Sequence, residues 1–301
     1  AFVGGSGVSI ITQPGIYDLP EAEYHADPCP TPSLSNSVAR ILLDESPMHA
    51  HFAHPRLNPN RVETEVTEVM RMGTAFHSIL LRKGASVVEV KFDDYKKNAA
   101  KESRDAAMES GMVPLLSKNY DAVHEMCRRA LIQMKQHPDL EGFFAPGQSE
   151  AIIAWQEGND WCRGMVDRLP DDLHFPAFDL KGTMLSASPL KWDRRLVDAY
   201  RTQDRFYNRG LCAIEGAERP PMRFVIVEMK EPHAVSVLTP APSLQAVAAE
   251  DVDRAIQIWS GCMRSDHWPG YEYMAHVEAP GWLLRDHEEQ QLRDEALENA
   301  L

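Results

Sequence analysis

Two short segments of the sequence carry the residue types needed for metal-assisted phosphate chemistry. Asp179 and Lys181 end a predicted strand, and the alternation of side chains along a strand places both on one face, with Leu180 turned into the core. Asp167 ends the preceding predicted strand, so a hairpin brings its carboxylate beside that of Asp179. Adjacent carboxylates raise each other's pKa unless a cation neutralises them, and Mg²⁺ or Mn²⁺ prefers such oxygen ligands. We therefore expect a divalent metal here, with the Lys181 ammonium orienting or deprotonating a water and stabilising a phosphoryl oxygen.

Taken alone, the Asp-x-Lys triplet is a weak signal, because about one is expected by chance in a chain of this size, and an exposed strand with a solvated ion pair explains it equally well. The other candidate sites are weaker still. His49, His51 and His54 have a spacing that does not place three side chains on one helical face, so they are interpreted as surface or pocket polarity. The five cysteines are widely spaced and form no Cys-x-x-Cys pair, which favours reduced thiols over disulfides or a zinc site.

The periodicity predicts one α/β domain with a helical N-terminal region. Helices are expected over 33–44, 67–82, 120–136, 188–210 and 244–263, and strands over 150–155, 161–167, 175–181, 224–228 and 234–238, the first three as an antiparallel meander. Residues 91–118 are either a loop or an exposed helix. We expect a loose tail over 1–32, a single domain over 33–283 (helical part 33–140, catalytic sheet 150–240) and an acidic helix over 284–301.

The composition is that of a globular protein. The distribution of charge along the chain bears on whether the protein can bind a nucleic acid. The 301 residues are 44% hydrophobic and carry a formal net charge of −14, which by itself argues against nucleic-acid binding. The charge is concentrated at the ends, however: residues 1–50 carry −5, residues 215–301 carry −9, and residues 51–214 are neutral. No apolar run is long enough to cross a bilayer and no signal peptide is recognisable, so we expect a cytoplasmic protein without membrane contact.

The motifs, taken together and in order, resemble those of the exonuclease VIII (RecE-type) family, in the RecB-like branch of the PD-(D/E)XK nuclease superfamily. The matching segments are GTAFH at 73–77, RGMVD at 163–167, DLKGT at 179–183 and QDRFY at 203–207. Gly182 stands where that family has Thr, a departure expected to loosen the strand end or a phosphate contact. The resemblance implies an α/β restriction-endonuclease-like fold, with a central mixed β-sheet flanked by helices.

The resemblance also implies roles for the central residues. Asp167 and Asp179 would ligate Mg²⁺, for which Mn²⁺ can substitute, with His77 and the Leu180 backbone carbonyl as further ligands. Lys181 would activate the attacking water or stabilise the transition state. Without the resemblance, His77 on the apolar side of a helix reads as a core histidine.

Three further residues have catalytic roles only by resemblance. Glu150 would hold a second ion or position the water, and it can equally be an ordinary carboxylate at the start of a strand. Gln203 and Tyr207 would lie over the mouth of the site and contact the DNA backbone or the lysine, and they can equally be helix-packing residues.

The function implied is that of a Mg²⁺-dependent exodeoxyribonuclease that degrades linear double-stranded DNA from its ends, 5′-to-3′, to generate single strands for phage-type recombination or repair. The implied partners are a second copy of the chain, in a homo-oligomeric ring of three or four, and a single-strand annealing protein. Two alternatives remain open: a RecB-like nuclease acting on single-stranded or flap DNA, and a catalytically silent member of the fold that binds DNA ends or a partner.

Overall fold

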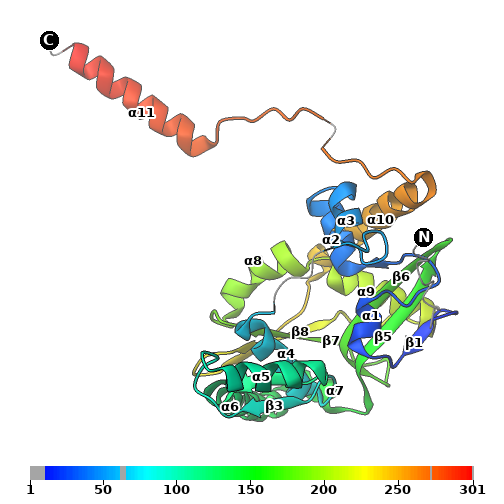
Figure 1. Ribbon diagram of the computed structural model, residues 1–301. Coiled ribbons are helices and arrows are strands. Elements are labelled where there is room, and N and C mark those ends of the chain that lie inside the picture. Colours follow the sequence, from blue (N-terminus) through cyan, green and yellow to red (C-terminus); the bar gives the residue numbers. More distant parts are fainter. Residues whose placement is uncertain (1–10, 62–65, 272, 300–301) are drawn as a thin grey trace. The chain divides into compact units, whose positions relative to one another are not determined.

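A computed structural model describes residues 11–61, 66–271 and 273–299, with helices packed around a mixed β-sheet (Figure 1). The strands are β1 Gly15–Tyr17, β2 Leu34–Ser35, β3 Val87–Val90, β4 Val113–Leu116, β5 Gly147–Glu157, β6 Asp160–Pro170, β7 Phe178–Thr183, β8 Arg223–Glu228 and β9 Val235–Leu238. The helices are α1 Glu21–His25, α2 Asn36–Asp44, α3 Pro47–Ala53, α4 Glu68–Leu81, α5 Asn98–Glu109, α6 Ser117–Gln136, the 3-10 helix Pro138–Leu140, α7 Glu141–Phe144, α8 Pro189–Tyr200, α9 Gln203–Glu215, α10 Pro242–Ser265 and α11 Gly281–Glu298.

The main sheet has the strand order β1-β5-β6-β7-β8-β9, with β2 paired to β6. Strand β6 runs antiparallel to both β5 and β7, as the sequence predicted, whereas β7 and β8 pair in parallel. A parallel pair needs a crossover connection, and the helices α8 and α9 provide it. This crossover brings Tyr200 and Gln203, at the junction of the two helices, close to the end of β7.

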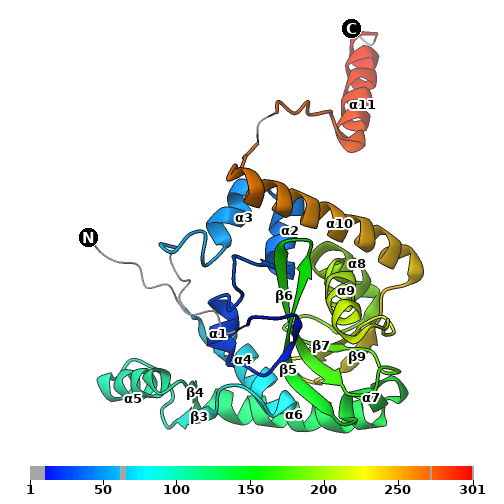
Figure 2. The same ribbon diagram turned by 90° about the vertical axis from the view of Figure 1, so that its right-hand side faces the viewer.

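Two hydrophobic layers cover the sheet. On one face, Phe178 and Leu180 of β7 pack with the apolar sides of α4 and α6. On the other face, Phe224 of β8 packs with α2, α9 and α10. Figures 1 and 2 show α6 and α10 on opposite sides of the sheet. Because neighbouring residues in a strand point to opposite faces, burial of Leu180 under α4 directs Asp179 and Lys181 toward the side of α8 and α9.

Local signals in the sequence place the helices that border the site. Helix α2 begins after Ser35, whose side chain accepts a hydrogen bond from the Val38 backbone N–H, and α4 begins after Thr67, which caps Met70 in the same way. Residues 91–118, for which a loop or an exposed helix was expected, contain helix α5 and also strand β4, which pairs with β3.

The expectation of a loose N-terminal tail is wrong for residues 11–32. Strand β1 pairs with β5 at the edge of the sheet, and Ile11, Tyr24 and Cys29 are buried against it. The signal was missed because a three-residue edge strand and a five-residue helix are too short to show periodicity. Residues 1–10 lie outside the described residues.

The chain divides into two compact units after Trp268, earlier than the expected boundary at residue 283. The second unit contains α11, which starts at Gly281 and has no buried residue among those described. In the described part of the chain, no helix combines the length and the apolar character needed to cross a membrane.

Candidate active site

The candidate site lies where strands β6 and β7 separate. The two strands share a single pair of facing residues, Arg168 and Phe178. Beyond that pair, a side-chain hydrogen bond replaces the backbone hydrogen bonds between the strands. The Oδ2 atom of Asp167 accepts it from the Leu180 backbone N–H at 2.7 Å. The strands therefore diverge around a carboxylate, and the opening exposes one edge of β7 to a cavity.

Asp179 and Lys181 face this opening from β7. Lys181 Nζ lies 2.6 Å from Asp179 Oδ2, and Gln203 Nε2 donates a hydrogen bond to Asp179 Oδ1. Among the described residues, none gives Asp179 Oδ2 a hydrogen bond of ordinary geometry, so the ion pair is its polar contact. A buried carboxylate oxygen without a hydrogen bond is costly, and it is a position where a cation can bind.

The pKa values in the site are set by two buried acids, Asp167 and Asp179, beside one base, Lys181. Burial and the nearby charge of Asp179 raise the pKa of Asp167 to about 6, although His77, Lys181 and the Leu180 N–H favour its ionised form. Burial alone would lower the pKa of Lys181, but Asp179 and Asp167 together raise it above its ordinary value. The group therefore places a charged lysine beside two acids, and burial together with the Asp179 charge opposes the ionisation of Asp167.

His77 reaches the site from the last turns of α4. Its Nδ1 atom lies 3.7 Å from Asp167 Oδ2, which is the predicted neighbourhood but longer than a hydrogen bond. A Cβ atom at Gly182 would lie 3.2 Å from Met229 Sδ, a tight contact with the end of a flexible side chain, and 3.4 Å from Phe76 Cδ1 of α4, an ordinary contact. The strand end is not loosened by this glycine, because β7 continues to pair with β8 through Thr183.

Glu150 lies close to Asp167 but belongs to a neighbouring cavity. Its φ of 51° is in the left-handed region, which is unfavourable for a residue with a side chain. Its carboxylate is directed to Gly84, where a Cβ atom would lie 3.2 Å from Glu150 Oε1. Burial, together with the charges of Glu21 and Asp167, raises the pKa of Glu150. Glu150 thus affects the site through its charge, and it does not line the cavity that holds the aspartates.

Gln203 and Tyr207 both come from α9 but occupy different positions. Gln203 contacts Asp179 rather than the lysine. Tyr207 is 8% exposed and packs against β6, where a Cβ atom on Gly164 would lie 2.8 Å from its Cε1 atom. Gly164, the glycine in the motif at 163–167, is therefore explained sterically, because the absence of a Cβ atom allows the Tyr207 ring to approach the strand. Both residues line the cavity, and Tyr207 also has the burial of a packing residue.

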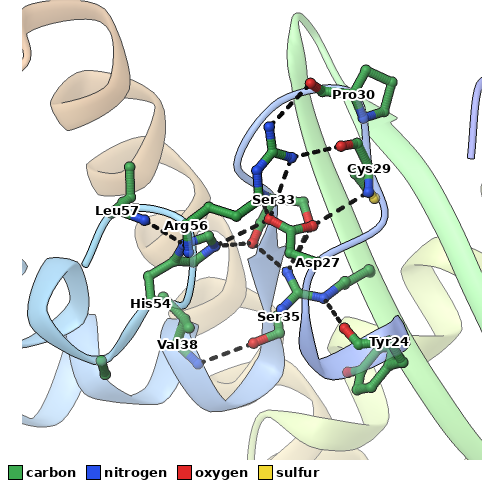
Figure 3. A network of polar contacts seen from close by, with 12 residues as sticks. Tyr24, Asp27, Cys29, Pro30, Ser33, Ser35, Val38, His54, Arg56 and Leu57 are labelled. Carbon is green, nitrogen blue, oxygen red and sulfur yellow. Dashed lines mark hydrogen bonds and ion pairs between the residues drawn. The ribbon is translucent and has the colours of Figure 1, made fainter. Parts of the chain in front are cut away.

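A buried polar network, which includes the cavity-lining residues Tyr24, Ser35 and Arg163, fixes one wall of the cavity (Figure 3). Arg163 of β6 donates to the Ser33 backbone oxygen, to Ser33 Oγ and to the Tyr24 backbone oxygen. Asp27 accepts hydrogen bonds from Ser33 and lies 3.3 Å from Arg163 Nη1. His54 Nε2 lies 3.1 Å from the Ser33 oxygen. The interpretation of His54 as surface or pocket polarity is therefore corrected, because its side chain is fully buried and braces the N-terminal segment.

The cavity has a volume of about 290 Å³ and includes residues that the sequence interpretation did not single out. They come from α1, β2 and α2: Tyr24, His25, Ser35, Asn36, Ser37 and Arg40. One signal was available, since Arg40 is the only Lys or Arg among the first fifty residues. In the structure the Arg40 guanidinium donates a hydrogen bond of 2.7 Å to the Ala199 backbone oxygen and lies 3.8 Å from Asp44 Oδ2.

The geometry of paired acids and a lysine at diverging strands agrees with the comparison with known families. Residues 43–278 match the family described as a PDDEXK-like domain of unknown function (DUF3799). The chain belongs to this family. The PDDEXK-like chain is also similar in fold to a crystal structure described as a "putative exonuclease" from Eubacterium rectale, with a TM-score of 0.54 and 11% identity over 88% of this chain and 96% of that one. No curated protein matches it. The expected α/β restriction-endonuclease-like fold is confirmed, and the family assignment supports the superfamily without selecting the exonuclease VIII branch.

Nucleases of the PD-(D/E)XK type typically use divalent metals, and the residues present fit such an ion in part. In favour are two buried carboxylates, one of whose oxygens, Asp179 Oδ2, has the Lys181 ammonium as its polar contact, since carboxylate oxygens are the donor type that a hard cation prefers. Within residues 11–61, 66–271 and 273–299, no group of three or more His, Cys, Asp or Glu side chains is close enough together to hold a metal. Mg²⁺ is commonly bound by one or two carboxylates with water completing its shell, so the aspartate pair suffices as a protein ligand set.

Proposed function

We propose that this PDDEXK-like protein is a Mg²⁺-dependent exodeoxyribonuclease that degrades linear double-stranded DNA from its ends, in the 5′-to-3′ direction, to generate single strands for recombination or repair. The observation that carries the proposal is the group formed by Asp167, Asp179 and Lys181 where β6 and β7 separate. The order of the motifs and the fold shared with a protein described as an exonuclease support the choice of DNA ends as the substrate.

The chain's own residues divide the work of hydrolysis. Asp167 and Asp179 would hold the metal, with His77 and the Leu180 carbonyl as further ligands, and the bound ion supplies Lewis-acid assistance to phosphodiester cleavage. Gln203 holds Asp179 in one orientation through its Oδ1 atom, and the Leu180 N–H does the same for Asp167. The Lys181 ammonium, kept charged by these acids, orients the attacking water or stabilises the negative charge that develops on the phosphoryl group.

A panel of DNA substrates tests the proposal. The wild type and Lys181→Ala are incubated with linear duplex labelled at the 5′ or the 3′ end, with closed circular duplex and with single strands, each with Mg²⁺, Mn²⁺ or EDTA. We expect wild-type protein with Mg²⁺ to release mononucleotides from the 5′ end of linear duplex, and Lys181→Ala to lose about 10²-fold or more in rate. Lys191→Ala, on the exposed surface of α8, is the matched control and keeps the wild-type rate.

Each other result points to a different conclusion. Cleavage of closed circles contradicts the exonuclease assignment and leaves a nuclease. Preference for single strands supports the single-strand or flap alternative. Intact DNA in every reaction with Mg²⁺ or Mn²⁺ refutes the enzyme and leaves a catalytically silent binder. Light scattering on the same preparation tests the ring of three or four copies, and a monomer refutes it. Co-purification tests the single-strand annealing partner.

A further inference from the structure

The Lys181 ammonium has a second contact besides Asp179. Its Nζ atom lies over the ring of Tyr200, 4.6 Å from the ring centroid. A cation over the face of an aromatic ring is attracted by the negative charge of that face, and more strongly where water is excluded. The Lys181 side chain is 20% exposed, so the contact is largely shielded.

The Tyr200 ring is itself held in place on two sides. It stacks on Trp192 of the same helix, with an angle of 11° between the planes and 6.2 Å between the centroids, and Trp192 is 2% exposed. It also contacts Phe224, with 6.4 Å between the centroids. Phe224 lies opposite Asp179 in the β7–β8 register. The ring is therefore a fixed platform tied to the strand beside the one that carries the lysine.

This platform matters because Asp179 cannot serve two cations equally. Gln203 donates to its Oδ1 atom and Lys181 contacts its Oδ2 atom, so an ion bound by Asp179 shares an oxygen with one of these partners, and an ion at Oδ2 weakens the hold on Lys181. If Asp179 were the only partner, the lysine would then be free to swing away on its four-carbon stem. The Tyr200 face attracts the ammonium without using a carboxylate oxygen.

We propose that Tyr200 is a positioning residue, whose ring face keeps the Lys181 ammonium in the cavity when Asp179 is engaged by a metal ion. This inference rests on the proposed nuclease function for its catalytic consequence, but the contact itself can be tested without activity. Tyr200→Phe keeps the ring face and the stack on Trp192, and Tyr200→Leu removes both.

The contact is measured by NMR on metal-free protein with lysine labelled at the ε carbon. Protons over an aromatic ring are shifted upfield, so the Lys181 ε signal, assigned by its loss in Lys181→Ala, lies upfield of those of exposed lysines. It stays there in Tyr200→Phe and moves to the position of the exposed lysines in Tyr200→Leu. An unchanged signal in Tyr200→Leu overturns the proposal.

The catalytic consequence is measured at saturating Mg²⁺ on linear duplex. We expect Tyr200→Leu to lower kcat about ten-fold with KM changed less than about two-fold, and Tyr200→Phe to remain within about two-fold of wild type. Leu196→Ala, buried on α8 one turn before Tyr200, is the control for loosened packing and keeps kcat above that of Tyr200→Leu.

The two proposals fail in different ways. A wild type that cuts no DNA refutes the proposed function, whatever the NMR signal shows. An active wild type whose Tyr200→Leu variant keeps its kcat, or whose Leu196→Ala variant loses as much kcat, refutes the positioning role alone.

Discussion

Replacement of Asp167 by Asn should make the metal-free protein more stable at neutral pH. The side chain keeps its size, and its amide oxygen can still accept the hydrogen bond that the Leu180 N–H donates. What is lost is a negative charge that burial and Asp179 oppose. A pKa raised from the ordinary aspartate value of about 3.9 to about 6 corresponds to about 3 kcal/mol.

The sign and the pH range follow from the direction of the shift. Because the pKa of Asp167 is higher in the folded than in the unfolded protein, folding favours its protonated form. Below pH 4 both states are protonated and the group has little effect. Between about pH 4 and about pH 6 the unfolded carboxyl ionises while the folded one stays protonated, so the free energy of unfolding falls, and above about pH 6 the full loss is present. Asp167→Asn should therefore gain about 3 kcal/mol at pH 8 and almost nothing at pH 4.

The assay is urea unfolding followed by tryptophan fluorescence in EDTA, at pH 4, 6 and 8. Asp121→Asn, an exposed change on α6, is the control and should shift the free energy of unfolding by less than about 0.5 kcal/mol. With Mg²⁺ at about 100 times its Kd, wild type should gain about 2.7 kcal/mol and Asp167→Asn should not. If Asp167→Asn is equally or less stable than wild type at pH 8, the view that burial and the Asp179 charge oppose the ionisation of Asp167 is refuted.

Two further substitutions test the surroundings of the site by urea unfolding. Gly164→Ala places a Cβ atom 2.8 Å from Tyr207 Cε1 and should cost about 1–3 kcal/mol, whereas Gly73→Ala, with open space in α4, should gain about 0.5–1 kcal/mol; equal effects would contradict the steric role of Gly164. Arg163→Met leaves the buried Asp27 charge without its nearest β6 partner and should cost about 3 kcal/mol, and adding Asp27→Asn should recover part of the loss. A double variant no more stable than Arg163→Met would show that this charge pair does not govern the wall of the cavity.

The elements that position the site were predictable where the signal is local. Apolar periodicity is a property of neighbouring residues, so α2 and α4 lie close to the predicted ranges 33–44 and 67–82, and the structure adds Ser35 and Thr67 as their caps. The antiparallel order of β5, β6 and β7 followed from strand alternation and the turn at Gly158. The N-terminal segment was not predicted, because what holds Asp27 and Ser33 in place is Arg163, 130 residues from Ser33 along the chain.

The sequence by itself determined that an acid and a lysine share one strand face, since side chains alternate along any strand, and that a second acid ends the strand before it. Only the tertiary structure decided how these groups meet. The separation of β6 from β7 depends on Asp167 bonding Leu180 N–H in place of a ladder partner. The left-handed backbone of Glu150 directs its carboxylate to Gly84 and out of the main cavity. The crossover through α8 and α9 sets the Tyr200 ring over Lys181 and Gln203 against Asp179. These contacts join segments distant in sequence, and no local pattern of residue types encodes their distances.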